Sequence, residues 1–269
     1  MNTLFNVLNR LWLIPIFIVL SSCLKDIRPD FMFSEQYKND NQQEKAEALL
    51  QVAAHNSGLE NWNKVSNYDV SLTDEFFGLM GKMAMPYKES KIDLKLNYNL
   101  NNANSIIEFD SGKEKGKKWK YIEGKYIMNK SNSDIAYSPN KEAQFWIPTY
   151  QYFLELTFRI SSGQIIRYAG TKTLNNTLYD LVFVSWKGES PQKDFDQYIL
   201  WLNKKNGLIE MVEYTVRDEY SFISACAIYT SYQTIDGITL PKKIEIKSNL
   251  NSKKSIHHMQ FENFRLHYN

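Results

Sequence analysis

The side chains best suited to chemistry in this sequence are its four histidines, and their spacing does not favour a metal site. His257 and His258 are adjacent in SIHHMQFENFRLHY, which we expect to be the last β-strand. Adjacent residues of a strand point to opposite faces, so the two rings are not expected to bind one metal ion. His55 closes an expected helix, where a ring that can carry positive charge suits the helix dipole. Zinc needs three or four converging ligands, so we expect no metal centre.

The nearest approach to a carboxylate cluster consists of Asp194, Asp196, Asp218 and Glu219. Carboxylates that flank hairpin strands are usually solvated, and we expect these to be. The chain has no Gly-x-Ser-x-Gly elbow, no phosphate-binding Gly-x-x-x-x-Gly-Lys and no His-Glu-x-x-His zinc helix. We therefore expect no enzymatic activity, no catalytic residue and no cofactor. A hydrolase that uses the scattered carboxylates is the alternative.

The N-terminus reads as an export signal. Arg10 precedes an apolar run, residues 11–20, which is too short to span a bilayer and is typical of a signal peptide. The sequence Leu20-Ser21-Ser22-Cys23 then resembles a bacterial lipobox, in which the cysteine is acylated and becomes the first residue of the mature chain. We expect residues 1–22 to be a lipoprotein signal peptide and Cys23 to carry a lipid anchor of several chains. An ordinary secretory signal is the alternative.

The residue after the cysteine indicates the destination. Leu24, in place of an aspartate, points to the outer membrane of a Gram-negative bacterium, by resemblance to the sorting rule of such lipoproteins. Residues 23–43 are expected to form the lipidated N-terminus and a flexible tether. The tether is predicted because the residues after Cys23 are polar and aperiodic. Residues 44–269 are expected to form a single domain.

The charge balance excludes one large class of partner. Removing residues 1–22 takes away one base, Arg10, and no acid, which leaves 31 Lys and Arg against 30 Asp and Glu. Nucleic acid demands a dense basic surface, so we expect no nucleic-acid binding.

Once Cys23 is lipidated, only Cys226 remains, and an intramolecular disulfide is impossible. Cys226 stands in an apolar, strand-like segment and is expected to be a buried, unreactive thiol.

The hydrophobic pattern changes from helical to strand-like near residue 60. Residues 44–58 predict a helix, with Gly58 as its stop. KIDLKLNYNL, residues 91–100, alternates as a strand with one solvated face does. The dipeptides Glu123-Gly124, Asn206-Gly207 and Asp236-Gly237 predict tight hairpin turns. We predict an α+β, mainly β fold: a curved antiparallel sheet with a helix lying across it.

Two predicted strands, residues 181–186 and 198–202, are apolar on both faces. Each must be covered on both sides or have one face in a cavity. The expected cover is FWIPTYQYFLELTFRI, residues 145–160, whose apolar side chains recur at three- and four-residue steps. Pro148 can begin a helix because its missing N–H costs nothing in the first turn. We predict a helix at about 148–158, with residues 156–160 extended as the alternative.

The aromatic side chains of these segments either fill an ordinary core or line a cavity that holds an apolar ligand. The residues that we expect to line such a cavity are Trp62, Phe145, Trp146, Tyr150, Phe153, Phe158, Trp186, Tyr198 and Trp201.

Several of these segments carry a family resemblance. HNSGLENWNKV, IPTYQYFLELTFRI, YDLVFVSW, DQYILWLNKKNGLIEMVEYTVRD and DGITLPKKIEI resemble a family of envelope lipoproteins of unknown function. That family is similar to the periplasmic lipoprotein carriers and receptors of the Lol type. The resemblance covers roughly residues 44–248 and implies an unclosed antiparallel half-barrel with helices on its concave side. In the Lol-type carriers the concavity receives acyl chains.

Two functions follow as hypotheses. The first is a lipid-anchored envelope protein that binds an acyl chain or another hydrophobic ligand, in lipoprotein or lipid handling. The second is an accessory interaction module of an envelope complex with a filled core and no small ligand. In the second case, exposed sheet edges near Pro241 or at the C-terminal strand would pair with an envelope protein.

Overall fold

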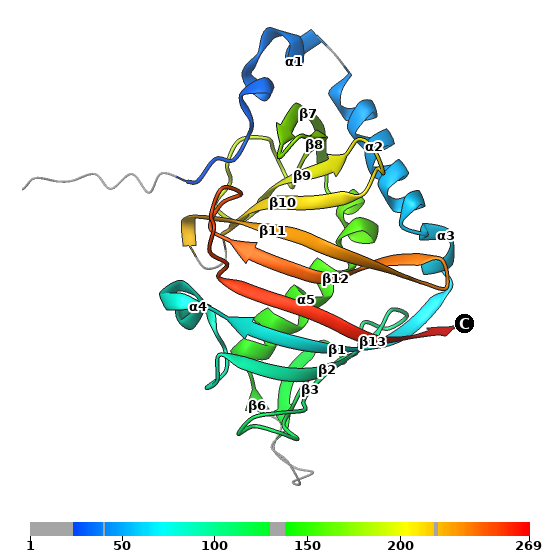
Figure 1. Ribbon diagram of the computed structural model, residues 1–269, viewed down its shortest axis with the longest axis vertical. Coiled ribbons are helices and arrows are strands. Elements are labelled where there is room, and N and C mark those ends of the chain that lie inside the picture. Colours follow the sequence, from blue (N-terminus) through cyan, green and yellow to red (C-terminus); the bar gives the residue numbers. More distant parts are fainter. Residues whose placement is uncertain (1–23, 40, 130–137, 218–219) are drawn as a thin grey trace, which may run out of the picture.

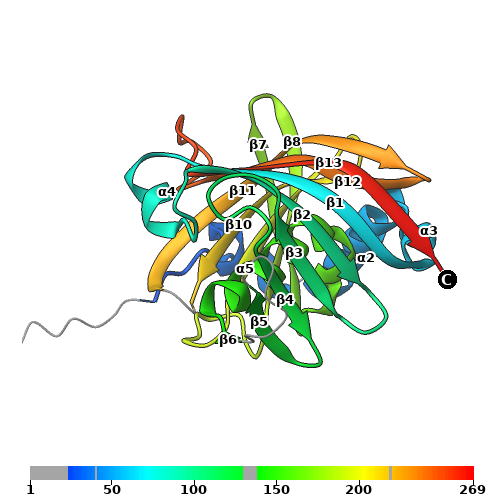
Figure 2. The ribbon, with the colours of Figure 1, turned by 90° about the horizontal axis from the view of Figure 1, so that it is seen from below.

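The computed structural model describes residues 24–39, 41–129, 138–217 and 220–269, so the predictions for residues 1–22 and Cys23 lie outside the described residues. Within these ranges one sheet of 13 strands runs in the order β6-β5-β4-β3-β2-β1-β13-β12-β11-β10-β9-β8-β7. Every neighbouring pair is antiparallel. The two end strands, β6 and β7, do not pair with each other, and Figure 2 shows the sheet bent around helix α5. The predicted unclosed, mainly β half-barrel is confirmed.

The strands come almost entirely from hairpins between neighbours in the chain, and the C-terminal strand joins the two halves of the sheet (Figure 1). The strands are β1 (Val65–Phe76), β2 (Lys91–Asn99), β3 (Ser105–Phe109), β4 (Lys118–Ile122), β5 (Lys125–Asn129), β6 (Ser138–Pro139), β7 (Ile165–Leu174), β8 (Thr177–Ser185), β9 (Gln197–Asn203), β10 (Ile209–Val216), β11 (Tyr220–Ile235), β12 (Ile238–Lys247) and β13 (His257–Tyr268). The helices are α1 (Glu35–Asn39), α2 (Gln42–Asn56), α3 (Leu59–Trp62), α4 (Gly78–Ala84) and α5 (Lys141–Arg159), with 3₁₀ turns η1 (Asp30–Phe33) and η2 (Ile160–Ser162).

The hairpin turns occur at the three dipeptides from which they were predicted. Glu123 and Gly124 have φ of 49° and 79°, and Asp236 and Gly237 have φ of 50° and 76°. Both pairs therefore adopt the left-handed conformations that a two-residue hairpin requires. Gly207, at φ 73°, closes the turn between β9 and β10. Strand β2 shows the expected alternation, with every second side chain buried.

Helix α2 forms as predicted and packs against β7 near one end of the sheet. The Asn41 side chain caps it by accepting a hydrogen bond from the Glu44 amide. Ala46, Leu50 and Ala53 are buried on its inner face. The helix stops before Gly58, whose φ of 85° suits a residue without a Cβ. Gly58 also lies against the β11–β12 turn, where an added Cβ would meet the Gly237 carbonyl oxygen at 2.1 Å.

Replacing Gly58 by alanine is expected to lower the free energy of unfolding by about 2 kcal/mol or more, because strain and a clash with backbone add together. Gly124→Ala is the matched control. Its φ of 79° is nearly the same, but no heavy atom lies within 4 Å of the added Cβ. That variant carries the conformational cost alone, about 1 kcal/mol. Urea unfolding measures both, and equal losses would show that the contact with the turn is unimportant.

Helix α5 is longer than the sequence predicted. It begins at Lys141, seven residues before Pro148, because the Asn140 side chain accepts a hydrogen bond from the Ala143 amide at 2.6 Å. Pro148 therefore lies inside the helix, and the prediction that it begins the helix is wrong. The other end continues as helix to Arg159 and then as η2, so residues 156–160 are not extended. The cap residue, and not the proline, is the start signal.

Strands β8 and β9 are covered on both faces, which is the first of the two alternatives that their sequences left open. Val182, Val184, Leu200 and Leu202 belong to the inner core, which α2 and α5 cover. Their neighbours of opposite parity form a second cluster on the other face: Leu181, Phe183, Ile199 and Trp201, joined by Met32, Ala169, Tyr179 and Met211.

The second cluster is covered by a segment that the sequence did not assign to it. Met32 of η1 is buried there, and Ile27 and Tyr37 pack against it. Figure 1 shows this N-terminal segment, in blue, lying against the end of the sheet that carries β7 and β8. Residues 25–37 therefore pack onto the sheet and do not form the free tether that the sequence predicted. The few apolar side chains of this segment cover the second cluster. They are too sparse in the sequence to show a helical or strand-like period.

The position of the C-terminal strand corrects one of the two predicted edges. β13 pairs with β1 on one side and β12 on the other, so it lies inside the sheet. Near Pro241 the register of β11 shifts between Ser231 and Tyr232, and the pairing of β12 with β13 covers only Lys243–Ile246. The sheet ends at β6 and β7. Long-range pairing between the first and last strands gives no local sequence signal.

Candidate functional site

A cavity of about 570 Å³ lies between the first half of α5, helix α4 and the sheet. The sheet contributes Phe76 of β1, Met259 of β13 and Ala225 of β11 to its walls, and α4 contributes Met80 and Met83. A volume of this size falls in the range of small-molecule sites, which are mostly apolar. Such walls can bind a hydrocarbon group by burying it away from water.

Three of the nine predicted lining residues reach this cavity: Phe145, Trp146 and Phe153, all on α5. Trp146 also contacts Phe76 edge-on, with ring centroids 5.5 Å apart. Tyr150 faces the same way but lies fully buried in the wall behind the cavity. The helical period of α5 therefore brings these four residues to one face, as the sequence indicated.

The other five predicted residues lie elsewhere. Trp62 and Phe158 stack on each other at 4.6 Å and fill the space under the far end of α5. Trp186 and Tyr198 contact each other edge-on, and neither borders the cavity. Trp201 lies on the opposite face of the sheet, in the second cluster, and donates a hydrogen bond to Glu213 at 2.9 Å. The prediction that these residues line one cavity with Phe145 does not hold, since their strands or helix ends point them into separate parts of the core.

Tyrosine hydroxyls fix α5 to the sheet. Tyr98 of β2 donates to the Ile147 carbonyl, at 3.0 Å. Tyr229 of β11 donates to the Phe153 carbonyl, also at 3.0 Å. Burial, as the largest cause, raises the pKa of both phenols well above the usual value, so they remain donors. The helix that forms one wall of the cavity is therefore held in one position.

A buried polar network stands behind the cavity, and the sequence analysis missed it. Asp74 of β1 is fully buried and accepts a hydrogen bond from the Tyr150 hydroxyl at 2.5 Å. The Tyr87 hydroxyl lies 2.5 Å from that of Tyr150. The Asp74 carboxylate also contacts Nε2 of His257. Burial, followed by the charge of Asp74, raises the pKa of both tyrosines well above the ordinary value.

His257 is the member of the network that borders the cavity. Its ring stacks on Phe76 with centroids 4.1 Å apart and meets the Trp146 ring edge-on at 5.6 Å. A sequence signal for the network did exist. Asp74 stands on the same strand parity as Val70, Leu72 and Phe76, so it is a charged residue on a buried face.

The other chemically suited residues are placed as follows. His258 points away from His257, toward Glu245 and the Phe77 ring, as the strand pattern predicted. Among the described residues no group of three or more His, Cys, Asp or Glu side chains is arranged to hold a metal ion. Cys226 is buried as predicted, and burial raises the pKa of its thiol to about 11.

The carboxylate cluster needs one correction. Asp196 is not simply solvated: it accepts hydrogen bonds from the Thr215 hydroxyl at 2.7 Å and from the Arg217 amide at 2.8 Å. It thereby fixes the end of β10 and has a structural role. Asp218 and Glu219 lie outside the described residues. None of the helices in the described ranges is long and apolar enough to cross a bilayer.

Comparison with known proteins identifies the fold. No protein-family model and no curated protein matches the chain. Among solved structures, a LolA superfamily protein of Nitrosomonas europaea is 12% identical and superposes with a TM-score of 0.52 over 82% of this chain and 93% of that one. A domain assigned to outer membrane lipoprotein sorting, from Vibrio parahaemolyticus, is 12% identical with a TM-score of 0.52 over 83% and 93%. A DUF1329 family protein of Desulfovibrio piger is 11% identical with a TM-score of 0.51 over 82% and 92%. The chain therefore has a Lol-like fold, as the resemblance implied.

Proposed function

We propose that this protein is a lipid-anchored envelope protein that binds an acyl chain or another hydrophobic ligand in the cavity between α5 and the sheet. The observation that carries the proposal is the apolar cavity of about 570 Å³, walled by Phe145, Trp146 and Phe153. Its position on the concave side agrees with a fold shared with a LolA superfamily protein. A signal peptide over residues 1–22, lipidation at Cys23 and an outer-membrane location complete the proposal.

The energetics suit reversible binding. Burying about 300 Å² of ligand hydrocarbon would contribute roughly 7 kcal/mol before the cost of ordering the ligand. Apolar contact alone therefore suffices, without a charged residue at the centre of the cavity. A ligand held in this way can also be released when another apolar site competes for it.

Native mass spectrometry tests the proposal directly. The mature protein is stripped of bound lipid, mixed with an extract of envelope lipids and measured again. A bound species of lipid mass in the second spectrum is the expected result. No copurifying or rebinding species would contradict it, and a stoichiometric protein partner found by crosslinking in intact cells would then favour the accessory module.

Filling the cavity should remove binding without unfolding the protein. Ala225 lies in the wall on β11, so Ala225→Trp is expected to weaken binding of a fluorescent fatty acid at least tenfold. Thr230→Trp, at an exposed position of the same strand, is the matched control and should bind as the unmodified protein does. Equal binding by both variants, with unchanged urea midpoints, would place the ligand elsewhere.

A further inference from the structure

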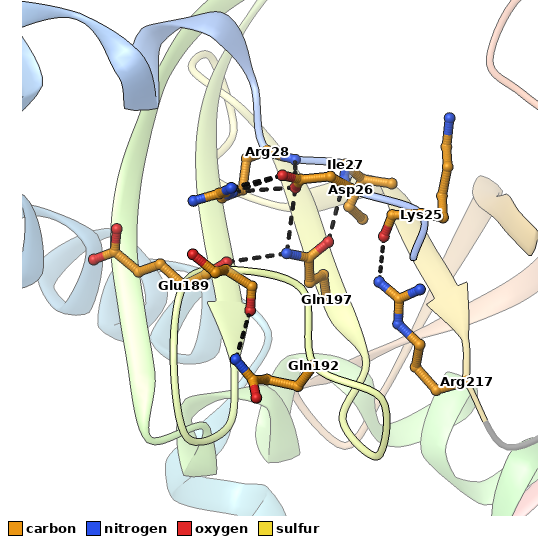
Figure 3. A network of polar contacts seen from close by, with 9 residues as sticks. Lys25, Asp26, Ile27, Arg28, Glu189, Gln192, Gln197 and Arg217 are labelled. Carbon is orange, nitrogen blue, oxygen red and sulfur yellow. Dashed lines mark hydrogen bonds and ion pairs between the residues drawn. The ribbon is translucent and has the colours of Figure 1, made fainter. Parts of the chain in front are cut away.

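The start of the described chain is held against the sheet beside Gln197 and Arg217 (Figure 3). The Lys25 amide donates to the Ser221 carbonyl at 3.0 Å. The buried Arg217 guanidinium donates to the carbonyl oxygens of both Lys25 and Ser221. Lys25 is thereby joined to the first residues of β11.

The next residues are held as firmly. Asp26 pairs with Arg28 at 2.7 Å. The buried Gln197 side chain accepts from the Ile27 amide at 3.2 Å and donates to Asp26 at 3.3 Å. Residues 25–28 therefore form a fixed strap. Cys23 precedes Lys25 by two residues, so at most about 7 Å of chain separates the proposed lipid anchor from the strap.

The same side of the molecule exposes large apolar side chains. Phe222, next to Ser221 on β11, is 66% exposed, and its neighbour Ile223 lines the cavity. Across the cavity, Met80 and Met83 of α4 line the opening and are 53% and 74% exposed, with Leu79 beside them at 76%. In both Figure 1 and Figure 2 the start of the blue segment, α4 and the beginning of β11 lie on one side.

We propose that the cavity opens toward the membrane that holds Cys23, with Leu79, Met80, Met83 and Phe222 seated in the bilayer surface. A long tether would let the domain face any direction, but a strap fixed at Lys25 brings this side against the lipid. The exposed apolar side chains gain a hydrocarbon environment there. A ligand could then pass between bilayer and cavity without crossing water. This inference rests on the lipid anchor of the proposed function.

Site-specific quenching tests the orientation in the full lipidated protein. Cys226 is buried with a raised pKa, so a thiol-directed fluorophore will label only an introduced cysteine. Met83→Cys and Phe222→Cys place the fluorophore at the opening. Val52→Cys and Leu178→Cys are matched controls, because these residues are also exposed apolar positions, at 49% and 46%, on α2 and β8.

The labelled proteins are reconstituted in phosphatidylethanolamine–phosphatidylglycerol vesicles that contain lipids brominated along their chains. Quenching at residues 83 and 222 is expected to exceed that at residues 52 and 178 by at least threefold. Vesicle flotation separates the two possible failures. Protein that does not float would overturn the lipid anchor and with it the proposed function. Protein that floats with equal quenching at all four sites, or with quenching at the controls only, would overturn the orientation and leave the anchor intact. A protein captured at residue 83 by photo-crosslinking in cells, with no quenching in vesicles, would also overturn it.

Discussion

Replacing Asp74 by alanine is expected to lower the free energy of unfolding by about 3–5 kcal/mol. The Asp74 carboxylate is fully buried and is the acceptor for Tyr150 and the partner of His257. Without it, the buried Tyr150 hydroxyl and the buried His257 imidazole both lose the carboxylate that they contact. Urea unfolding, followed by circular dichroism, measures the loss.

Two further variants show whether the loss of stability comes from the buried network or from any change of a carboxylate on a strand. Asp74→Asn keeps one acceptor oxygen for Tyr150 and should lose less than Asp74→Ala. Asp110→Ala removes a carboxylate whose ion pair with Lys95, at 2.8 Å, is exposed, and it should leave stability nearly unchanged. If the Asp74 and Asp110 variants unfold at the same urea concentration, the buried network does not stabilise the fold.

How far the sequence could predict this molecule depends on how local each signal is. The hairpins at Gly124 and Gly237 were predictable because two residues alone fix the turn conformation. The strand 91–99 was predictable because alternation is read along one segment. The position of β13 between β1 and β12 was not, since it joins segments far apart in the chain.

The lining of the cavity was also only partly predictable from local sequence. An aromatic residue is equally suited to a filled core and to a cavity wall, so its type does not say which it occupies. Phe145, Trp146 and Phe153 were found because they share one face of a single helix. Trp201 was misplaced because strand β9 is apolar on both faces, and nothing within it says which face meets α5. Trp201 lies on the face of β9 that points away from α5, where Met32 and other residues of the N-terminal segment cover it.

The protein is expected to unfold cooperatively within about two pH units above pH 10. Burial, as the largest cause, raises the pKa of six tyrosines well above the ordinary value of 10: Tyr68, Tyr87, Tyr98, Tyr150, Tyr198 and Tyr229. A raised pKa in the folded state means that stability is complete below the unfolded pKa and is lost as the pH rises toward the folded one. Above pH 10 each unfolded phenol releases a proton that the folded protein retains, which costs about 1.4 kcal/mol per pH unit.

Six such phenols together remove about 8 kcal/mol per pH unit, which is comparable to the whole stability of an ordinary domain, about 5–15 kcal/mol. Phenolate absorbance and circular dichroism, recorded during one alkaline titration, should therefore change together in a single step. High salt serves as the control, because it screens repulsion between exposed charges and leaves the burial of the phenols unaltered, so the midpoint should barely move. If most tyrosines ionise near pH 10 while the circular dichroism stays constant, these hydroxyls are accessible to water. In that case Tyr98 and Tyr229 do not hold α5 to the sheet, and the wall of the cavity is not fixed in the way that the hydrogen bonds to Ile147 and Phe153 imply.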